Sequence, residues 1–330
     1  MTRLIREIDR YSLLLLATVL LATLLPASGQ FAVALGWVTK LAIAMLFFLH
    51  GAKLSRQAIL SGITNWKLHI VVFLATFMLF PLLGVAFSEG TAFFLDPMLV
   101  TGILFLTLLP STVQSSIAFT SIAGGNVPAA VCAASLSNFA GIFITPVLTA
   151  LLIGAHGSGG DSLAAIQAIM IQLLLPFLAG HLLRPLVGGI ISRHKYVVSL
   201  LDRGSILLVV YSAFSAAVIE GLWQSVPVWQ LLVTVAVCIL LLALVLAITH
   251  YSGRALGFSP ADRATILFCG SKKSLASGVP MAGVLFPAAQ VGAIILPLMI
   301  FHQLQLLVCA AIAQRWARKP DVAGPAAMAN

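Results

Sequence analysis

Almost the whole chain divides into apolar runs of about 20 residues, the length that a helix needs to cross a lipid bilayer. Pro, Gly and Asn mark the turns between the runs. Only 8% of the 330 residues are charged, whereas an ordinary soluble domain has roughly 25%. We therefore predict an all-α membrane protein of about ten transmembrane helices. The predicted spans are residues 11–28, 32–53, 67–88, 98–122, 127–153, 162–186, 202–222, 228–250, 262–283 and 288–313.

The positive charges predict the orientation of these spans. With the N-terminus in the cytoplasm, all but three of the 18 Lys and Arg residues fall on the cytoplasmic side, and the three exceptions lie within spans. This distribution predicts a protein of the bacterial inner (plasma) membrane with both termini in the cytoplasm. It also accounts for the net charge of +9 without a nucleic-acid partner, the lipid bilayer being the expected one. The exceptions are Lys40, Lys272 and Lys273.

The first apolar run has a second interpretation. Arg3, Arg6 and Arg10 precede it, and it ends near Ala27-Ser28-Gly29, as a cleaved secretory signal would. Since the rest of the chain is itself membrane-spanning, we favour an uncleaved first helix.

Spans four and nine contain similar sequences, Gly102-Ile-Leu-Phe105 and Thr265-Ile-Leu-Phe268, and each then becomes polar and rich in helix breakers. The polar stretches are residues 109–116, with Pro110, and residues 269–280. Ten spans can form two sets of five. Because a set of five ends on the opposite side of the membrane from where it starts, the second set would have the inverted orientation. Broken helices at matched positions of two inverted halves indicate the binding site of a secondary transporter. The alternative is a simple proline kink in each helix.

Lys272 and Lys273 lie about ten residues beyond Arg263, roughly 15 Å into the membrane. An unpaired charge at that depth costs roughly 2.5–3.5 kcal/mol, and no Asp or Glu occurs between Asp262 and Asp321. One interpretation is that the lysines face an aqueous cavity, bind an anionic substrate or titrate during transport. The other is that they hydrogen-bond carbonyl groups freed by the broken helices.

Other polar side chains gather near the two breaks and on spans five and ten. Hydroxyl and amide groups suit a small cation or a polar substrate, and a histidine can relay protons. Each residue alone could equally join two helices by a hydrogen bond. With the two lysines, the predicted substrate- or ion-binding residues are Gln114, Ser115, Ser116, Ser135, Asn138, Ser271, Ser274, His302 and Gln303.

No enzyme motif is present, and neither GxSxG, HExxH nor a Walker A sequence occurs. We therefore predict that the chain is not an enzyme and needs no cofactor other than a coupling ion. A channel or a regulatory membrane protein without ion coupling is the alternative to a transporter. A channel should show a polar stripe along several helices, whereas the polar residues here cluster at two breaks.

The sequence resembles the bile acid:sodium symporter family, most closely its bacterial YfeH-type subfamily, over nearly its whole length. The matching stretches are His50-Gly-Ala-Lys-Leu-Ser55, Gln114-Ser-Ser-Ile-Ala-Phe-Thr120, Gly124-Gly-Asn-Val127, Phe268-Cys-Gly-Ser-Lys-Lys-Ser-Leu-Ala276 and Leu296-Pro-Leu-Met-Ile-Phe-His-Gln303.

The resemblance implies two inverted five-helix repeats in which spans four and nine cross at their breaks. It further implies a symporter whose small organic-anion substrate enters a cleft between a panel domain and a core domain, with sodium behind the crossing. The implied parts are 1–66 and 156–226 (panel), 67–155 and 227–314 (core) and 315–330 (cytoplasmic tail).

The sodium ligands implied by the resemblance are only partly present. Ser115 matches a Ser ligand, and Ser116 stands where sodium-binding members have Asn. Ala130 and Ala134 replace a Ser and a Thr, and Lys272-Lys273 occupies the region of a missing acidic residue. We therefore hypothesise that a lysine ammonium takes the place of sodium and that its protonation cycle couples transport to protons, which leaves sodium and proton coupling as alternatives.

Overall fold

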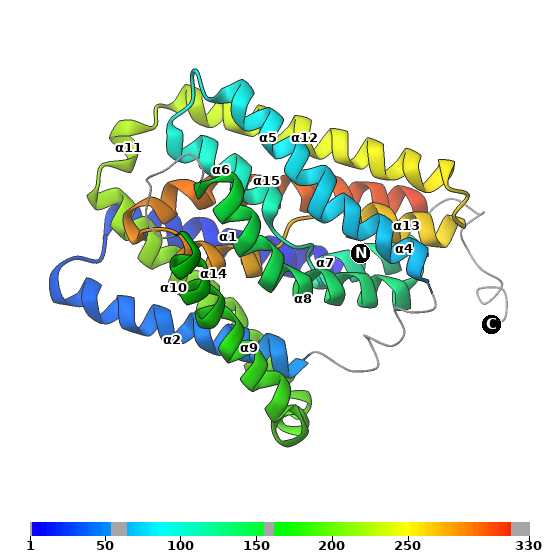
Figure 1. The fold of residues 1–330 in the computed structure, drawn as a ribbon, viewed down its shortest axis with the longest axis horizontal. Helices are drawn as coiled ribbons and strands as arrows, with labels where there is room; N and C mark the ends of the chain where they lie inside the picture. Colours follow the sequence, from blue (N-terminus) through cyan, green and yellow to red (C-terminus); the bar gives the residue numbers. More distant parts are fainter. Residues whose placement is uncertain (1, 54–64, 155–161, 318–330) are drawn as a thin grey trace.

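The computed structural model describes residues 2–53, 65–154 and 162–317, and within these ranges every regular element is a helix (Figure 1). The elements are α1 (Thr2–Leu24), α2 (Gly29–Lys53), α4 (Trp66–Leu74), the π-helix η2 (Ala75–Leu79), α5 (Phe80–Thr91), α6 (Pro97–Leu108), α7 (Gln114–Ile122), α8 (Val127–Leu152), α9 (Ser162–Arg193), α10 (Lys195–Ile219), α11 (Leu222–Ser225), α12 (Val228–Ala255), α13 (Pro260–Gly270), α14 (Leu275–Leu285) and α15 (Ala288–Ala317).

In the described part of the chain, seven helical segments are long and apolar enough to cross a membrane. They are α2, α4–η2–α5, α8, the part of α9 from Leu173, α10, α12 and α15. Shorter apolar helices correspond to the predicted first and fourth spans. Large apolar side chains such as Trp37 and Leu41 are exposed on the outside of the molecule, as expected for a surface that faces lipid.

The main differences from the predicted spans are at helix ends. Helix α10 begins at Lys195 rather than near residue 202, and α9 continues to Arg193. Both extensions contain charged residues. Hydropathy assigns such residues to loops, although they can also occur in a helix. The predicted tail begins at residue 315, and the part of it beyond Ala317 lies outside the described residues.

Local sequence explains where several helices begin. The side chains of Asp96, Asn126 and Ser259 accept hydrogen bonds from the first turns of α6, α8 and α13. A proline follows each of these caps within two residues, where its missing N–H would have had no helical partner.

Helices α2 and α9 pack backbone to backbone through a reciprocal pair of glycines. A Cβ atom on Gly51 would overlap the carbonyl of Phe177, and one on Gly180 would overlap the carbonyl of Phe48. Helices α1 and α2 also pack on α10, so these four helices form one group. Figure 1 shows α2 and α9 on the side of the molecule opposite α5 and α12.

The second group, α4 to α8 and α12 to α15, meets the first mainly where α15 packs on α10. A Cβ atom on Gly292, near the start of α15, would come within 2.6 Å of the Ala217 side chain. This tight contact lies near the end of α10 that is remote from Lys195, so the two groups are closed against each other at that end.

Candidate functional site

The two broken helices meet at their non-helical segments. The chain between α6 and α7 (residues 109–113) lies beside the chain between α13 and α14 (residues 271–274), and the Ser274 N–H donates to the Pro110 carbonyl at 2.9 Å. Pro110 has no N–H to continue α6, and Leu109 before it is extended, as the residue before proline usually is. The structure therefore brings the two predicted breaks together.

Serine side chains pair with backbone groups that the broken helices leave free. The Ser111 and Ser116 hydroxyls donate to the carbonyls of Cys269 (2.6 Å) and Phe268 (3.0 Å) near the end of α13. The Ser271 hydroxyl donates to the Leu267 carbonyl, four residues earlier. Because a helix end buried away from water needs such partners, these serines hold the crossing together.

Asn138 of α8 joins both breaks through one amide. Its Nδ2 donates to the Ser111 carbonyl at 2.6 Å, and its Oδ1 accepts from the Ser277 hydroxyl at 2.8 Å. The remaining proton on Nδ2 is donated to the Ala134 carbonyl.

An Asn138→Ala substitution should lower the stability of the crossing. Ser111 and Ser277 would each lose a partner, and each buried polar group left unsatisfied costs about 1–3 kcal/mol. Ser135→Ala is the matched control, since Ser135 lies one turn away on α8 and also lines the cavity described below. Thermal unfolding of the purified variants measures the effect, and equal melting temperatures for the two would contradict this role of Asn138.

Lys273 is fully buried, and its ammonium has all three protons donated. Nζ bonds to the carbonyls of Thr76 (2.8 Å), Thr107 (2.7 Å) and Leu109 (2.6 Å). The ring of Phe80 lies 4.1 Å from Nζ. These are the contacts that the second interpretation of the lysines predicts.

The π-helix explains why the Thr76 carbonyl is free. In η2 each N–H bonds to the carbonyl five residues earlier, as the Phe80 N–H does to Ala75. The next residue, Pro81, has no N–H, so Thr76 lacks a partner in that register. Lys273 supplies the missing donor.

Gln305 of α15 fixes the backbone of Lys273. Its amide accepts from the Lys273 N–H and donates to the Lys273 carbonyl, both at 2.9 Å. The same Nε2 lies 2.9 Å from Nδ1 of His302. Gln303, the predicted residue two positions earlier, is half-buried and does not line the cavity described below.

Lys272 is equally buried, but its environment is apolar. Its Nζ has no hydrogen-bond partner in the described part of the chain and lies 3.8 Å from the Phe119 ring centroid and 5.7 Å from that of Phe268. The ammonium of Lys273 is therefore surrounded by carbonyl oxygens, whereas that of Lys272 lies against aromatic rings.

A cavity of about 400 Å³, here the central cavity, lies beside the crossing between the two helix groups. Helices α1, α2, α9 and α10 form one side of it, and α7, α8, α14 and α15 form the other. Six predicted residues line it, whereas Ser116, Ser271, Lys272, Lys273 and Gln303 do not. The six are Gln114, Ser115, Ser135, Asn138, Ser274 and His302.

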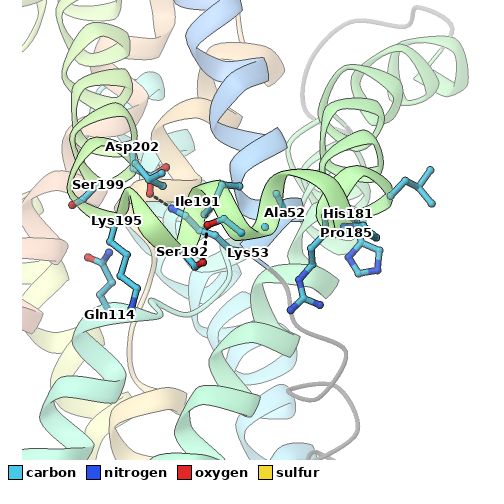
Figure 2. A pocket seen from close by; sticks show the side chains of 15 residues that line it. Ala52, Lys53, Gln114, His181, Pro185, Ile191, Ser192, Lys195, Ser199 and Asp202 are labelled. Carbon is cyan, nitrogen blue, oxygen red and sulfur yellow. Dashed lines mark hydrogen bonds and ion pairs between the residues drawn. The ribbon is translucent and has the colours of Figure 1, made fainter.

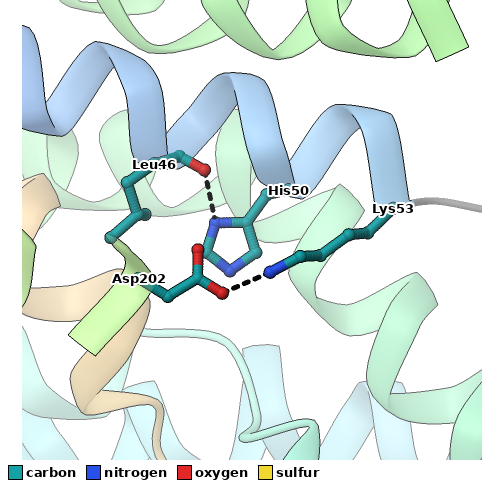
Figure 3. Close-up of polar contacts among 4 residues, drawn as sticks. All are labelled: Leu46, His50, Lys53 and Asp202. Carbon is teal, nitrogen blue, oxygen red and sulfur yellow. Dashed lines mark hydrogen bonds and ion pairs between the residues drawn. The ribbon is translucent and has the colours of Figure 1, made fainter. Parts of the chain in front are cut away.

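Charged residues line the central cavity at the end where α2 stops. Lys53 forms an ion pair with Asp202 of α10, and Figure 3 shows this pair beside the ring of His50. His50 Nδ1 lies 2.9 Å from the Leu46 carbonyl, and Arg203 lies over the ring of Tyr11 at 5.5 Å. In the sequence, Lys53 and Arg203 act only as topology signals, and Asp202 was not predicted as part of a site. The signal that could have indicated it is its acidic side chain in a basic segment, between Lys195 and Arg203.

A second cavity of about 870 Å³ is here called the vestibule, and Figure 2 shows the side chains that line it. The two share Lys53, Gln114, Ser199 and Asp202 among their lining residues. Since α2 ends and α10 begins there, the vestibule opens at the end of the molecule opposite the contact of Gly292.

A family model, that of the SBF-like CPA transporter family, matches residues 9–318. The chain belongs to this family. It is 58% identical to the uncharacterized protein PA2026 of Pseudomonas aeruginosa over 318 residues, with 96% of each chain covered. It is 52% identical to "Putative symporter YfeH" of Escherichia coli, with 97% of this chain and 96% of the relative covered. Sodium/bile acid cotransporter 7 of Rattus norvegicus is 27% identical, with 82% and 80% covered.

This SBF-like CPA transporter family member is thus a multi-pass membrane transporter of the symporter type, as the resemblance implied, and not an enzyme. Its crossing does not fit the sodium ligands that the resemblance implied. The hydroxyls of Ser115 and Ser116 both bond to the Thr112 hydroxyl, and Ala130 and Ala134 offer no side-chain oxygen. The positively charged ammonium of Lys273, at the same crossing, would also repel a sodium ion.

Proposed function

We propose that the protein is a secondary active transporter that moves a small organic anion across the bacterial inner membrane by alternating access. The chain then spans the membrane ten times, in two inverted sets of five, with both termini in the cytoplasm. Helix α1 and the broken pairs α6/α7 and α13/α14 supply the three spans beyond the seven long helical segments.

The observation that carries this proposal is the position of the central cavity. It lies between α1, α2, α9 and α10, which we assign to the panel, and the remaining spans, which we assign to the core, and it ends against the polar crossing. The vestibule connects it to the end of the molecule that we assign to the cytoplasm. At the other end the contact of Gly292 with α10 closes the two parts. A cavity open at one end and closed at the other suits a carrier better than a channel.

The charge of the cavity wall favours an anion. Lys53 and Asp202 pair with each other, so their charges cancel. Among the described lining residues, the Arg203 guanidinium is then the net positive charge, and His50 lies on the same wall. The apolar remainder includes Phe139, Phe177 and Ile206 and suits the carbon skeleton of an organic ion. The rat relative is named a sodium/bile acid cotransporter, and bile acids are organic anions.

The ammonium of Lys273 replaces a bound cation at the crossing. It lies where two helices are broken and satisfies three carbonyls at once, as a coordinated metal ion would. Transport is therefore expected to continue in sodium-free buffer.

Binding can be tested without knowing the natural substrate. We expect taurocholate, hexanoate or benzoate to raise the melting temperature of the purified full-length protein by several degrees, because a ligand at 100 times its Kd adds about 2.7 kcal/mol. Hexanamide and benzamide should not. A Lys53→Gln variant should lose the shift, and Lys67→Gln, whose ammonium lies over the Trp66 ring outside the cavity, should keep it.

The same assay tests the coupling ion. Replacing potassium or choline with sodium should leave the melting temperature unchanged. A sodium-specific rise would refute the built-in cation, and uncharged amides that stabilise the protein as well as their anions would refute anion selectivity.

A further inference from the structure

The two lysines at the break between α13 and α14 differ in their hydrogen-bond partners. Lys273 has three carbonyl partners and cannot give up a proton without leaving one of them unpaired. Lys272 has no such partner among the residues that the structure describes. We propose that Lys272 carries the coupling proton and that Lys273 is the fixed charge. This inference rests on the proposed transport function, since it names the ion that the cycle uses.

The groups that face Lys272 set its affinity for a proton. Phe119 of α7 and Phe268 of α13 present ring faces. The titratable groups that interact with it electrostatically are the thiols of Cys269 and Cys309 and the imidazole of His302. The neighbouring α4, α8 and α12 carry the further titratable residues Lys67, His69, Cys132, Cys238, His250, Tyr251 and Arg254.

In the described part of the chain, no carboxylate pairs with this amine. The sequence has no Asp or Glu from Pro97 to Leu152, which covers α6 to α8, and none between Asp262 and Asp321. The aromatic rings favour the ammonium, whereas complete burial without a hydrogen bond favours the neutral amine. Because the two influences oppose each other, a rearrangement that changes either one shifts the protonation of the amine.

His302 connects the amine to the central cavity. Its side chain lines the cavity and interacts electrostatically with Lys272. The Gln305 oxygen is held by the Lys273 N–H, so the Gln305 NH₂ group faces His302 and Nδ1 accepts. The neutral ring then carries its proton on Nε2. In this arrangement the ring has no free lone pair, so the relay requires His302 to turn away from Gln305. Nδ1 then takes a proton from cavity water as Nε2 gives its proton to the neutral Lys272 amine, and the reverse steps return the proton to water.

The segments that surround Lys272 also form the cavity wall. Helix α7 carries both Phe119 and the cavity residues Gln114 and Ser115, and Ser274 follows the lysines by one residue. A change of charge at Lys272 therefore acts on the segments that a substrate touches, which is what coupling requires.

The pH dependence of stability tests the proton site. An unfolded lysine stays charged until about pH 10, whereas in the proposed cycle the folded protein releases the proton of Lys272 below that pH. The melting temperature of the full-length protein in potassium buffer should therefore rise as the pH rises from 7 towards 10. Lys272→Met should remove this part of the rise. Lys272→Arg, whose guanidinium does not deprotonate, should remove it too and should melt lower. An unchanged slope in the variants, or failure of both to fold, would overturn the proposal.

Thiol labelling tests whether the proton is coupled to conformation. The native cysteines Cys132, Cys238, Cys269 and Cys309 are all buried, so a Ser199→Cys variant places a reactive thiol where the two cavities meet. Because the thiolate is the reactive form, labelling by a charged maleimide speeds up with pH in any variant. The pH profile of the Ser199→Cys protein should therefore differ in shape from that of the same protein with Lys272→Met added. Superimposable pH profiles would exclude coupling. If no organic anion stabilises the protein but both pH effects occur, the substrate proposal fails and the proton site stands.

Discussion

A Lys273→Met variant should melt far below the parent protein or fail to accumulate in a folded form. Methionine fills a similar volume, but it leaves the carbonyls of Thr76, Thr107 and Leu109 buried without a donor. Each buried carbonyl left without a donor costs about 1–3 kcal/mol. Thermal unfolding in detergent, read together with size-exclusion chromatography, measures the loss.

The adjacent residue supplies the control. Lys272→Met removes an equally buried lysine one position earlier, but within the described ranges no hydrogen bond is lost with it. We expect that variant to stay close to the parent near neutral pH. If both substitutions lowered the melting temperature equally, the three carbonyl contacts would not explain the stability of the crossing.

The second large effect is expected from Gly51→Ala. The added methyl group would overlap the Phe177 carbonyl, and because that atom belongs to the α9 backbone it cannot move aside by a change of rotamer. Overpacking of side chains costs about 1–3 kcal/mol, so a clash with backbone should reach at least the top of this range. Loss of monodisperse protein after purification is the expected observation.

Gly36→Ala is the matched substitution on the same helix. A Cβ atom there has nothing within 4 Å, and alanine is favoured over glycine in a helix by about 0.5–1 kcal/mol. It should therefore be neutral or slightly stabilising. A Gly51→Ala protein as stable as Gly36→Ala would show that α2 and α9 do not depend on their close approach.

The spans and the breaks could be predicted from sequence because both are local signals. Hydropathy located the long helices, and Pro110 marked the first break. The second break has a different cause from the one expected. Pro280 lies inside α14, and the helix is interrupted earlier, at residues 271–274, where Ser274 caps the next helix. Polarity, rather than proline, was the useful signal there.

The long-range contacts could not be predicted from local patterns. Nothing near Lys273 in the sequence indicates the Thr76 carbonyl, which becomes free only through a π-helix followed by Pro81. Asp202 and Lys53 resemble ordinary loop charges, because hydropathy does not show that the ends of α2 and α10 meet at a cavity. The sequence left two interpretations of the lysine pair open, and the structure gives Lys273 and Lys272 different surroundings.

The three carbonyl contacts of Lys273 also bear on bioenergetics. A cation that belongs to the polypeptide is present in every turn of the cycle and is never drawn from an ion gradient. If a monovalent anion moves with one proton on Lys272, no net charge crosses the membrane. The membrane potential, worth about 2.3 kcal/mol per charge at 100 mV, would then neither drive nor oppose uptake. Accumulation of the substrate would follow the difference in pH alone.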